Sequence, residues 1–132
     1  PVDVLDAQTS TSPIVATHGG TIARAAVRLS IDHTFDGDLD ISLVSPAGTT
    51  RDLSSDNGSS GPDYTATIFD NACATAITAG MPPYTGCYTP EQPLTLLNGQ
   101  NPDGVWLLNV YDDASGDTGA ITNWSLALCV TP

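Results

Sequence analysis

The feature that most constrains this chain is the segment 36–50, which reads D-G-D-L-D-I-S-L-V-S-P-A-G-T-T. Its apolar residues occupy alternate positions: Leu39, Ile41 and Leu43. Its first carboxylates alternate as well: Asp36, Asp38 and Asp40. Because successive side chains of an extended chain point to opposite faces, the segment has one apolar face and an acidic start. The S-P-A-G that follows favours a tight turn. We therefore expect a strand that packs on a sheet, with a cation near its acidic start.

Further strand signals recur along the chain, in short segments that alternate or are rich in β-branched and aromatic residues. These segments are 22–31, 39–43, 49–53, 64–69, 94–97, 105–111 and 120–130. No window repeats apolar residues at helical spacing, and the one short helix candidate is 71–78. Seven or eight strands between Gly-, Pro- and Asn-rich turns predict an all-β fold, namely an antiparallel β-sandwich of jelly-roll, galactose-binding-like type.

Two regions of different character divide the chain. Residues 1–13 are rich in Thr, Ser and Asp and end at Pro13, which favours a linker from a preceding domain. Residues 14–132 then form a single domain. The first residues lack a basic region followed by an apolar stretch, and they begin with Pro1 rather than Met. We expect the chain to be the tail of a longer, multidomain, secreted precursor, and no apolar run is long enough for a membrane helix.

The charge excludes some partners. Fifteen acidic residues face three arginines and no lysine, which gives a net charge of −12. Such a surface disfavours nucleic acid and anionic membranes, because both require Lys and Arg. Unneutralised, the charge destabilises the folded state by self-repulsion, which bound divalent cations would relieve. The alternative is that the acids only keep an extracellular domain soluble.

The three cysteines suggest one disulfide. Cys73 and Cys87 flank a loop rich in Gly and Pro, and a bridge between them would stabilise the fold by about 3 kcal/mol in the chain-entropy model. Cys129 alternates with Leu126 and Leu128 and is expected to face away from them. A zinc site is disfavoured, because no C-x-x-C occurs and both histidines lie far from the cysteines in sequence.

Acidic residues gather in four groups at predicted loops and strand ends. The groups are Asp36/Asp38/Asp40, Asp56/Asp63, Asp70 with Asn71, and Asp112/Asp113/Asp117. Calcium takes six to eight oxygen ligands, so several loops usually meet to hold it. The loop 112–119 is the best candidate. An EF-hand is excluded, because position six of the D-x-D-x-D loop is Ile41 instead of Gly and position twelve is Ala47 instead of Glu. Solvated acidic turns without a metal are the alternative.

Catalytic interpretations find little support. No G-x-S-x-G motif is present. His33 is expected to be a hydrogen-bonded structural residue rather than a base. A carboxylate pair could act on glycosides, but the chain has few aromatic residues to line a sugar cleft. Trp106 and Trp124 are expected in the core, with a sugar-stacking platform as the alternative. We expect no catalytic residues.

Four blocks carry a family resemblance. They are H-T-F-D-G-D-L-D-I-S-L-V-S-P-A-G-T (33–49), I-F-D-N-A (68–72), L-N-G-Q-N-P-D-G-V-W-L-L-N-V-Y-D (97–112) and G-D-T-G-A-I-T-N-W-S-L-A-L (116–128). In this order the chain resembles the P domain (P/Homo B domain) of proprotein convertases and bacterial secreted proteases. The resemblance implies a jelly-roll sandwich that follows a subtilisin-like or metallopeptidase catalytic domain and helps it to fold and to stay stable.

The resemblance also implies candidate calcium ligands. The first-rank ligands are Asp38, Asp70, Asp112 and Asp117, and the second-rank ligands are Asp36, Asp63 and Asp113. Asn71 stands where many relatives carry a second Asp, which lowers the charge expected there. The Cys73–Cys87 loop is not a general family feature.

Two functions follow as hypotheses. The first is a non-catalytic, calcium-binding accessory domain of a secreted protease, most often a serine endopeptidase, whose partner is the catalytic domain of the same chain. The second is a module that targets a polymeric protein or polysaccharide substrate. The second rests on the fold class and on Tyr84 and Tyr88, which we expect to be exposed on the cysteine loop.

Overall fold

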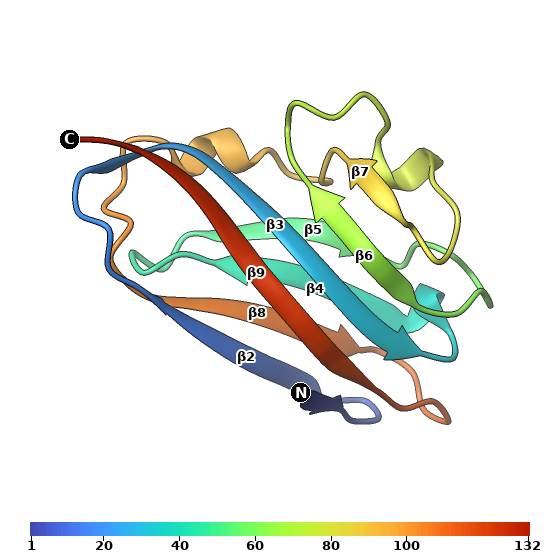
Figure 1. The fold of residues 1–132 in the computed structure, drawn as a ribbon. Coiled ribbons are helices and arrows are strands. Elements are labelled where there is room, and N and C mark those ends of the chain that lie inside the picture. Colours follow the sequence, from blue (N-terminus) through green and yellow to red (C-terminus); the bar gives the residue numbers. More distant parts are fainter.

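The computed structural model describes all 132 residues and contains nine strands and three short 3-10 helices. The strands are β1 (Val2–Val4), β2 (Thr9–Ala16), β3 (Thr21–His33), β4 (Leu39–Val44), β5 (Thr50–Ser55), β6 (Tyr64–Phe69), β7 (Gly86–Tyr88), β8 (Gly104–Asp112) and β9 (Gly119–Thr131). The 3-10 helices are η1 (Asp36–Asp38), η2 (Ile77–Ala79) and η3 (Leu94–Leu97). Figure 1 shows the long strands β3 and β9 side by side across the front of the molecule.

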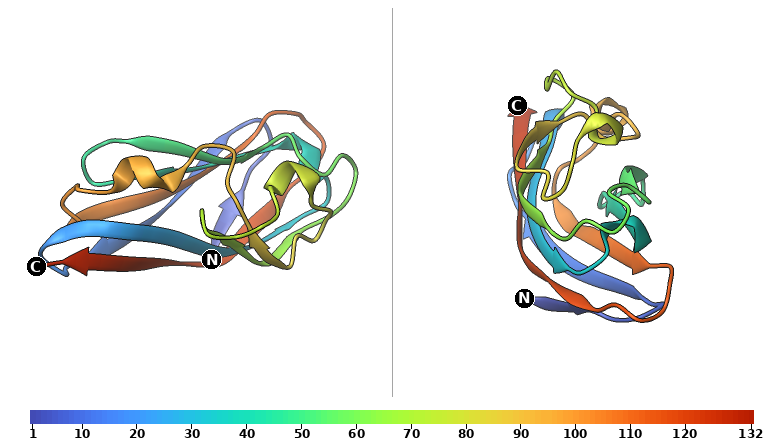
Figure 2. Two further views of the ribbon diagram at one scale, coloured as in Figure 1. Left: turned by 90° about the horizontal axis from the view of Figure 1, so that it is seen from above. Right: turned by 90° about the vertical axis from the view of Figure 1, so that its right-hand side faces the viewer.

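The strands form two packed sheets, one with the order β1-β9-β3-β6-β7 and the other with the order β2-β8-β4-β5. Figure 2 shows the two layers edge-on. Apart from the short parallel strand β7, every pairing is antiparallel. Without β7, consecutive strands pass from one sheet to the other, except for the β4–β5 hairpin, in the manner of an eight-stranded jelly roll. The predicted β-sandwich is confirmed.

The core lies between the sheets and is built by the alternating strands. It contains 21 buried apolar residues. On β4 the buried side chains are the predicted ones, Leu39, Ile41 and Leu43. On β8, the neighbouring strand in the same sheet, Trp106, Leu108 and Val110 are fully buried in the same alternation. The period-2 pattern thus selects the inner face of both strands.

Both tryptophans pack in the core, as the sequence predicts. Trp106 is fully buried, and its Nε1–H donates to the carbonyl of Pro102 at 2.9 Å. Trp124 packs against the core from β9, and its Nε1–H donates to Ser12 Oγ at 3.0 Å. Because Trp106 is fully buried and the half-buried Trp124 lies on the core side of β9, the alternative of a sugar-stacking platform has no support.

The structure corrects the expected linker over residues 1–13. These residues contain β1, which pairs with β9, and five of the eight residues of β2, which pairs with β8 along its whole length. Pro13 lies within β2 opposite Leu107. A proline is tolerated there because β2 is an edge strand and its outer side needs no donor. Alternate positions of β2 are exposed, which explains its polar composition.

Two smaller expectations also change. Leu94–Leu97 is the 3-10 helix η3 and not a strand, and it buries Leu94 and Leu97. The helix candidate 71–78 contains only the start of η2. Both segments lie in the long connection between β6 and β8, which the bonded pair Cys73–Cys87 ties together.

Cys129 is free and exposed, as expected. No helix in this chain has the length and apolar character needed to cross a membrane.

Candidate metal centre

One end of the sandwich collects carboxylates because of its strand pairing. β4 runs antiparallel to both of its neighbours, so its first residues meet the last residues of β5 and β8. Two backbone hydrogen bonds fix this meeting point: Asp56 N–H donates to the Leu39 carbonyl at 3.0 Å, and Asp113 N–H donates to the Asp38 carbonyl at 2.8 Å. In Figure 1 this is the end at which β3 and β8 finish and β4 begins.

Three carboxylates from three separate segments converge there: Asp40, Asp56 and Asp113. One oxygen of each lies within 4.8 Å of the other two. Asp40 is half-buried, and its Oδ1 is shielded from solvent with no hydrogen-bond partner in the protein. Carboxylate oxygens at this mutual distance are the donors that Ca²⁺ prefers. We refer to these three residues as the acidic triad.

The electrostatics of the acidic triad reflect the crowding. The pKa of Asp56 is raised to about 7, first because its carboxyl shares a hydrogen bond with that of Asp113 and then because it is shielded from water. Burial and the charge of Asp113 raise the pKa of Asp40. Repulsion between such close carboxylates favours protonation of one or more of them. A bound divalent cation would neutralise the same charge and let all three stay ionised.

Asp38 and Asp117 lie beside the acidic triad. Burial raises the pKa of Asp38, followed by the charges of Asp112, Asp117 and Asp113. Asp117 is oriented by Thr34, whose hydroxyl donates to Asp117 Oδ1 at 2.5 Å. The structure thus brings together Asp38, Asp113 and Asp117 from the predicted ligands.

Asp112 has a different environment from the other predicted ligands. It is fully buried, and its Oδ2 lies 3.0 Å from His33 Nε2. Because a carboxylate oxygen only accepts, Nε2–H is the donor to Asp112, while Nδ1 lies against the backbone of Phe35, 3.0 Å from its carbonyl oxygen and 3.1 Å from its nitrogen. The other oxygen of Asp112 accepts from the Ala114 N–H at 3.2 Å. Asp112 therefore positions the loop 112–119, and His33 is the hydrogen-bonded structural histidine that the sequence predicts.

Asp36 and Asp63 form a second, more deeply buried pair. Asp36 is fully buried, and neither carboxylate oxygen has a hydrogen-bond partner in the protein. Burial, with the charge of Asp63 second, raises the pKa of Asp36 to about 8. The carboxyl is therefore protonated at neutral pH unless a cation neutralises it. Asp63 Oδ1 accepts from the His33 N–H at 2.9 Å, so this pair borders the acidic end through β3.

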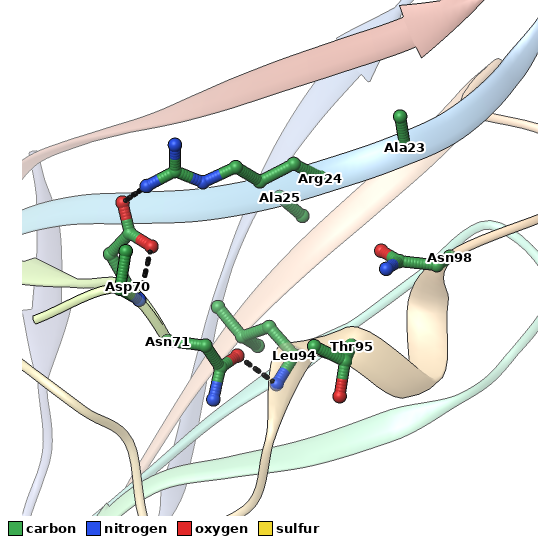
Figure 3. Close-up of a pocket in the computed structure, with 9 residues that line it drawn as sticks. Ala23, Arg24, Ala25, Asp70, Asn71, Leu94, Thr95 and Asn98 are labelled. Atoms are coloured by element: carbon green, nitrogen blue, oxygen red, sulfur yellow. Dashed lines mark hydrogen bonds and ion pairs between the residues drawn. The ribbon is translucent and has the colours of Figure 1, made fainter.

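Asp70, the remaining predicted ligand, lies elsewhere. It follows β6, next to Phe69, which pairs with Val27 in the middle of β3. One oxygen of Asp70 pairs with Arg24, and the other accepts from the Ala72 N–H (Figure 3). The Asn71 side chain accepts from the Leu94 N–H at 2.7 Å. Both side chains hold the long connection in place and are remote from the acidic triad.

The predicted ligands do not include Asp40 and Asp56, although both belong to the acidic groups in the sequence. The register of the β4–β5 hairpin could have indicated both residues. The two strands flank the predicted turn, and their register pairs Asp40 with Ser55, the residue before Asp56. Asp6 was missed altogether. Its carboxylate accepts from the N–H groups of Gly116 and Asp117, so the first loop of the chain braces the loop 112–119.

Tyr84 is not on the surface, contrary to the expectation for the cysteine loop. It is 1% exposed and stacks on Tyr64, with ring centroids 4.8 Å apart. Tyr88 meets the edge of Tyr84 and packs against the core. The aromatic support for a polymer-binding module is thereby removed.

Comparison with known proteins places these features in a family. Residues 22–128 match the family described as the proprotein convertase P-domain. The chain belongs to this family. The resemblance predicted from the four sequence blocks is confirmed.

The relatives of this P domain are larger proteases. It is 36% identical, over 88% of its length, to a transglutaminase-activating metalloprotease of Streptomyces mobaraensis, of which it covers 12%. It is 29% identical, over 96% of its length, to a calcium-dependent protease of Nostoc sp., of which it covers 17%. The chain thus spans a small part of these relatives.

Solved structures agree on the fold. A serine protease of Aeromonas sobria, solved in complex with a chaperone, matches 96% of this chain with a TM-score of 0.64 and 20% identity. The chain covers 24% of that protease. The family is therefore protease-associated, and the catalytic type of the relatives varies between metalloprotease and serine protease.

Proposed function

We propose that this P domain is a non-catalytic, calcium-binding accessory domain that stabilises the catalytic domain of a secreted protease. The observation that carries the proposal is the acidic triad, in which three segments far apart in sequence bring carboxylates within 4.8 Å of one another. The donor set fits calcium, because it consists only of oxygen and Asp38 and Asp117 can extend it. One relative is named a calcium-dependent protease.

A calcium ion here would act as a structural clamp. The acidic triad joins the start of β4, the end of β5 and the end of β8, which are the segments that close one end of the sandwich. A cation would also neutralise part of the charge of −12 that opposes compact folding. A second cation between Asp36 and Asp63 would satisfy the two buried oxygens of Asp36 that lack partners.

Three features support placement outside the cell. The bonded Cys73–Cys87 pair is typical of oxidising compartments. The abundant carboxylates and scarce cationic side chains suit a calcium-rich medium. One relative is named a calcium-dependent protease, which suits the same medium.

The test is removal of the domain from its parent protease. Deletion of residues 1–132 should lower the yield of active protease and the temperature at which activity is lost, and calcium should no longer protect the shortened enzyme through this domain. A parent carrying Asp40→Asn with Asp113→Asn should fall between the two. A deleted protease with unchanged yield and heat resistance would refute the accessory role.

A further inference from the structure

We infer that the outer face of the five-stranded sheet is the surface on which the catalytic domain of the same chain docks, through an otherwise uncharged segment that presents a carboxylate to Arg28. This inference rests on the proposed accessory function and names the surface that performs it. We define the outer sheet face by the outward side chains of β3, β6 and β9 that lie beside the hollows described next: Ala23, Arg24, Ala26, Arg28, Ile68, Ser125, Ala127 and Cys129. Asp32 of β3 and Asp3 of β1 also point outward from this sheet, but they do not line the hollows.

Every hollow on this molecule lies on or beside the outer sheet face. The three hollows have volumes of about 360, 170 and 320 Å³, and Asp70 lines all of them. The largest opens between β3 and η3, with the Arg24–Asp70 pair on one side and Asn98 on the other (Figure 3). The other two continue over β3 and β9 beside Ala26 and Ala127. Neighbouring hollows share lining residues, so the three adjoin one another along this face.

The charge of this face differs from that of the rest of the molecule. It carries two of the three arginines, and Asp70 is the only carboxylate that lines the hollows. These three groups sum to +1, and since the whole chain carries −12, the remainder carries −13. Asp3 and Asp32 add two carboxylates farther along the same sheet, so an acidic partner meets the least repulsion beside the hollows, and complementary charge would favour docking there.

Arg28 is the residue that can recognise a partner. Arg24 already pairs with Asp70, whereas Arg28 forms no ion pair and is exposed. An unpaired guanidinium offers a planar set of donors that matches a carboxylate in two-point contact. The small side chains around it, such as Ala26, Ser125 and Ala127, let a second surface approach the sheet closely.

The margin of the face offers backbone groups as well. β1 pairs with β9 only at residues 119–121, so from Asn123 to Thr131 the strand β9 is hydrogen-bonded on one side only, to β3. This part of β9 carries no charged residue and no proline before Pro132, the devices that usually protect an exposed strand edge. Its free N–H and C=O groups can anchor an apposed segment by strand addition.

The catalytic domain is the occupant that fits these observations best. The relatives extend far beyond this domain, which covers between 12% and 24% of the chains compared above. A tethered neighbour has a high effective concentration, so one charge pair and a shallow face suffice for docking. A second copy of this domain is the competing occupant, and it is distinguished by the experiment below.

Cys129 provides a built-in reporter, because it is free, exposed and lines the hollow beside Arg24. We would alkylate the intact parent protease with N-ethylmaleimide and follow the Cys129 peptide by mass spectrometry. Docking should slow alkylation by about tenfold or more relative to a parent that carries Arg28→Glu. The matched control is Arg51→Glu, which reverses an arginine on the opposite sheet that donates only to backbone carbonyls, and it should keep Cys129 protected.

Rapid alkylation of Cys129 in the unaltered parent would overturn the inference, and so would protection that Arg28→Glu does not reduce. Protection that disappears on dilution would assign the face to a second copy and would also overturn it. Deletion of the domain separates this failure from that of the proposed function. If heat resistance of the protease still depends on the domain while Cys129 reacts freely, only the docking surface is wrong.

Discussion

Replacement of a single carboxylate of the acidic triad should change the melting temperature in opposite directions with and without calcium. In chelator, Asp56→Asn removes one of three crowded charges, so the melting temperature should rise by a few degrees. In saturating calcium the same change removes a ligand, and the melting temperature should fall. Thermal unfolding followed by circular dichroism measures both. Asp3→Asn is the control, because it removes an equal charge from an exposed position on β1 and should have no calcium-dependent effect.

The pH dependence of stability should also depend on calcium. The folded-state pKa values of Asp56 and Asp36 are raised to about 7 and about 8 from an ordinary value of 3.8. The folded protein therefore holds protons that the unfolded chain releases, and this contribution to stability is lost as the pH rises from about 4 to 8. In chelator the melting temperature should fall over this range. The increase that calcium adds should be larger at pH 8 than at pH 5, and equal increments would contradict the assignment.

At the scale of the elements, β1 and β2 are parts of the sandwich and should be indispensable. β2 pairs with β8 through eight residue pairs, and Trp124 bonds to Ser12 on it. Deletion of residues 1–16 should expose the edge of β8 and abolish cooperative unfolding, as judged by calorimetry. A linker would tolerate the deletion without loss of stability, so a cooperative transition at the original temperature would refute this assignment.

The positions of most strands were predictable from the sequence, whereas the strands with which they pair were not. β4 and β8 follow from alternation because each buries every second side chain. β2 was not predicted as a strand because its T-S-T-S start resembles a linker. Only its long-range pairing with β8 makes it a strand. Leu94–Leu97 has strand-like residues, but it buries Leu94 and Leu97 by turning as a 3-10 helix.

The candidate site was predictable as a region and not as a set of ligands. The acidic residues at 36–40 and 112–117 were identified as groups, but Asp40 and Asp56 meet only through the β4–β5 register, which includes a bulge. Asp70 looked equivalent to the others in sequence. Its pairing with Arg24, 46 residues away, is visible only in the fold.

At the scale of the whole molecule, the charges are arranged unevenly. One end gathers the carboxylates of the acidic triad together with Asp38 and Asp117, while the outer sheet face holds Arg24 and Arg28. This polarity agrees with the two proposals: cation binding at the end that closes the sandwich, and docking beside the hollows, where the two arginines outnumber the one carboxylate. In the arrangement that we propose, calcium would stabilise the domain, and the domain in turn would stabilise its neighbour.

Thermal unfolding of this domain in calcium and in chelator tests the calcium-binding role most directly. A ligand that binds only the folded state adds about 2.7 kcal/mol at a hundredfold excess over Kd. For a domain of this size that raises the melting temperature by about 5 to 10 °C. We expect this increase in calcium and its loss in Asp40→Asn with Asp113→Asn, while Asp3→Asn retains it. Equal melting temperatures in calcium and in chelator would contradict the proposed calcium site.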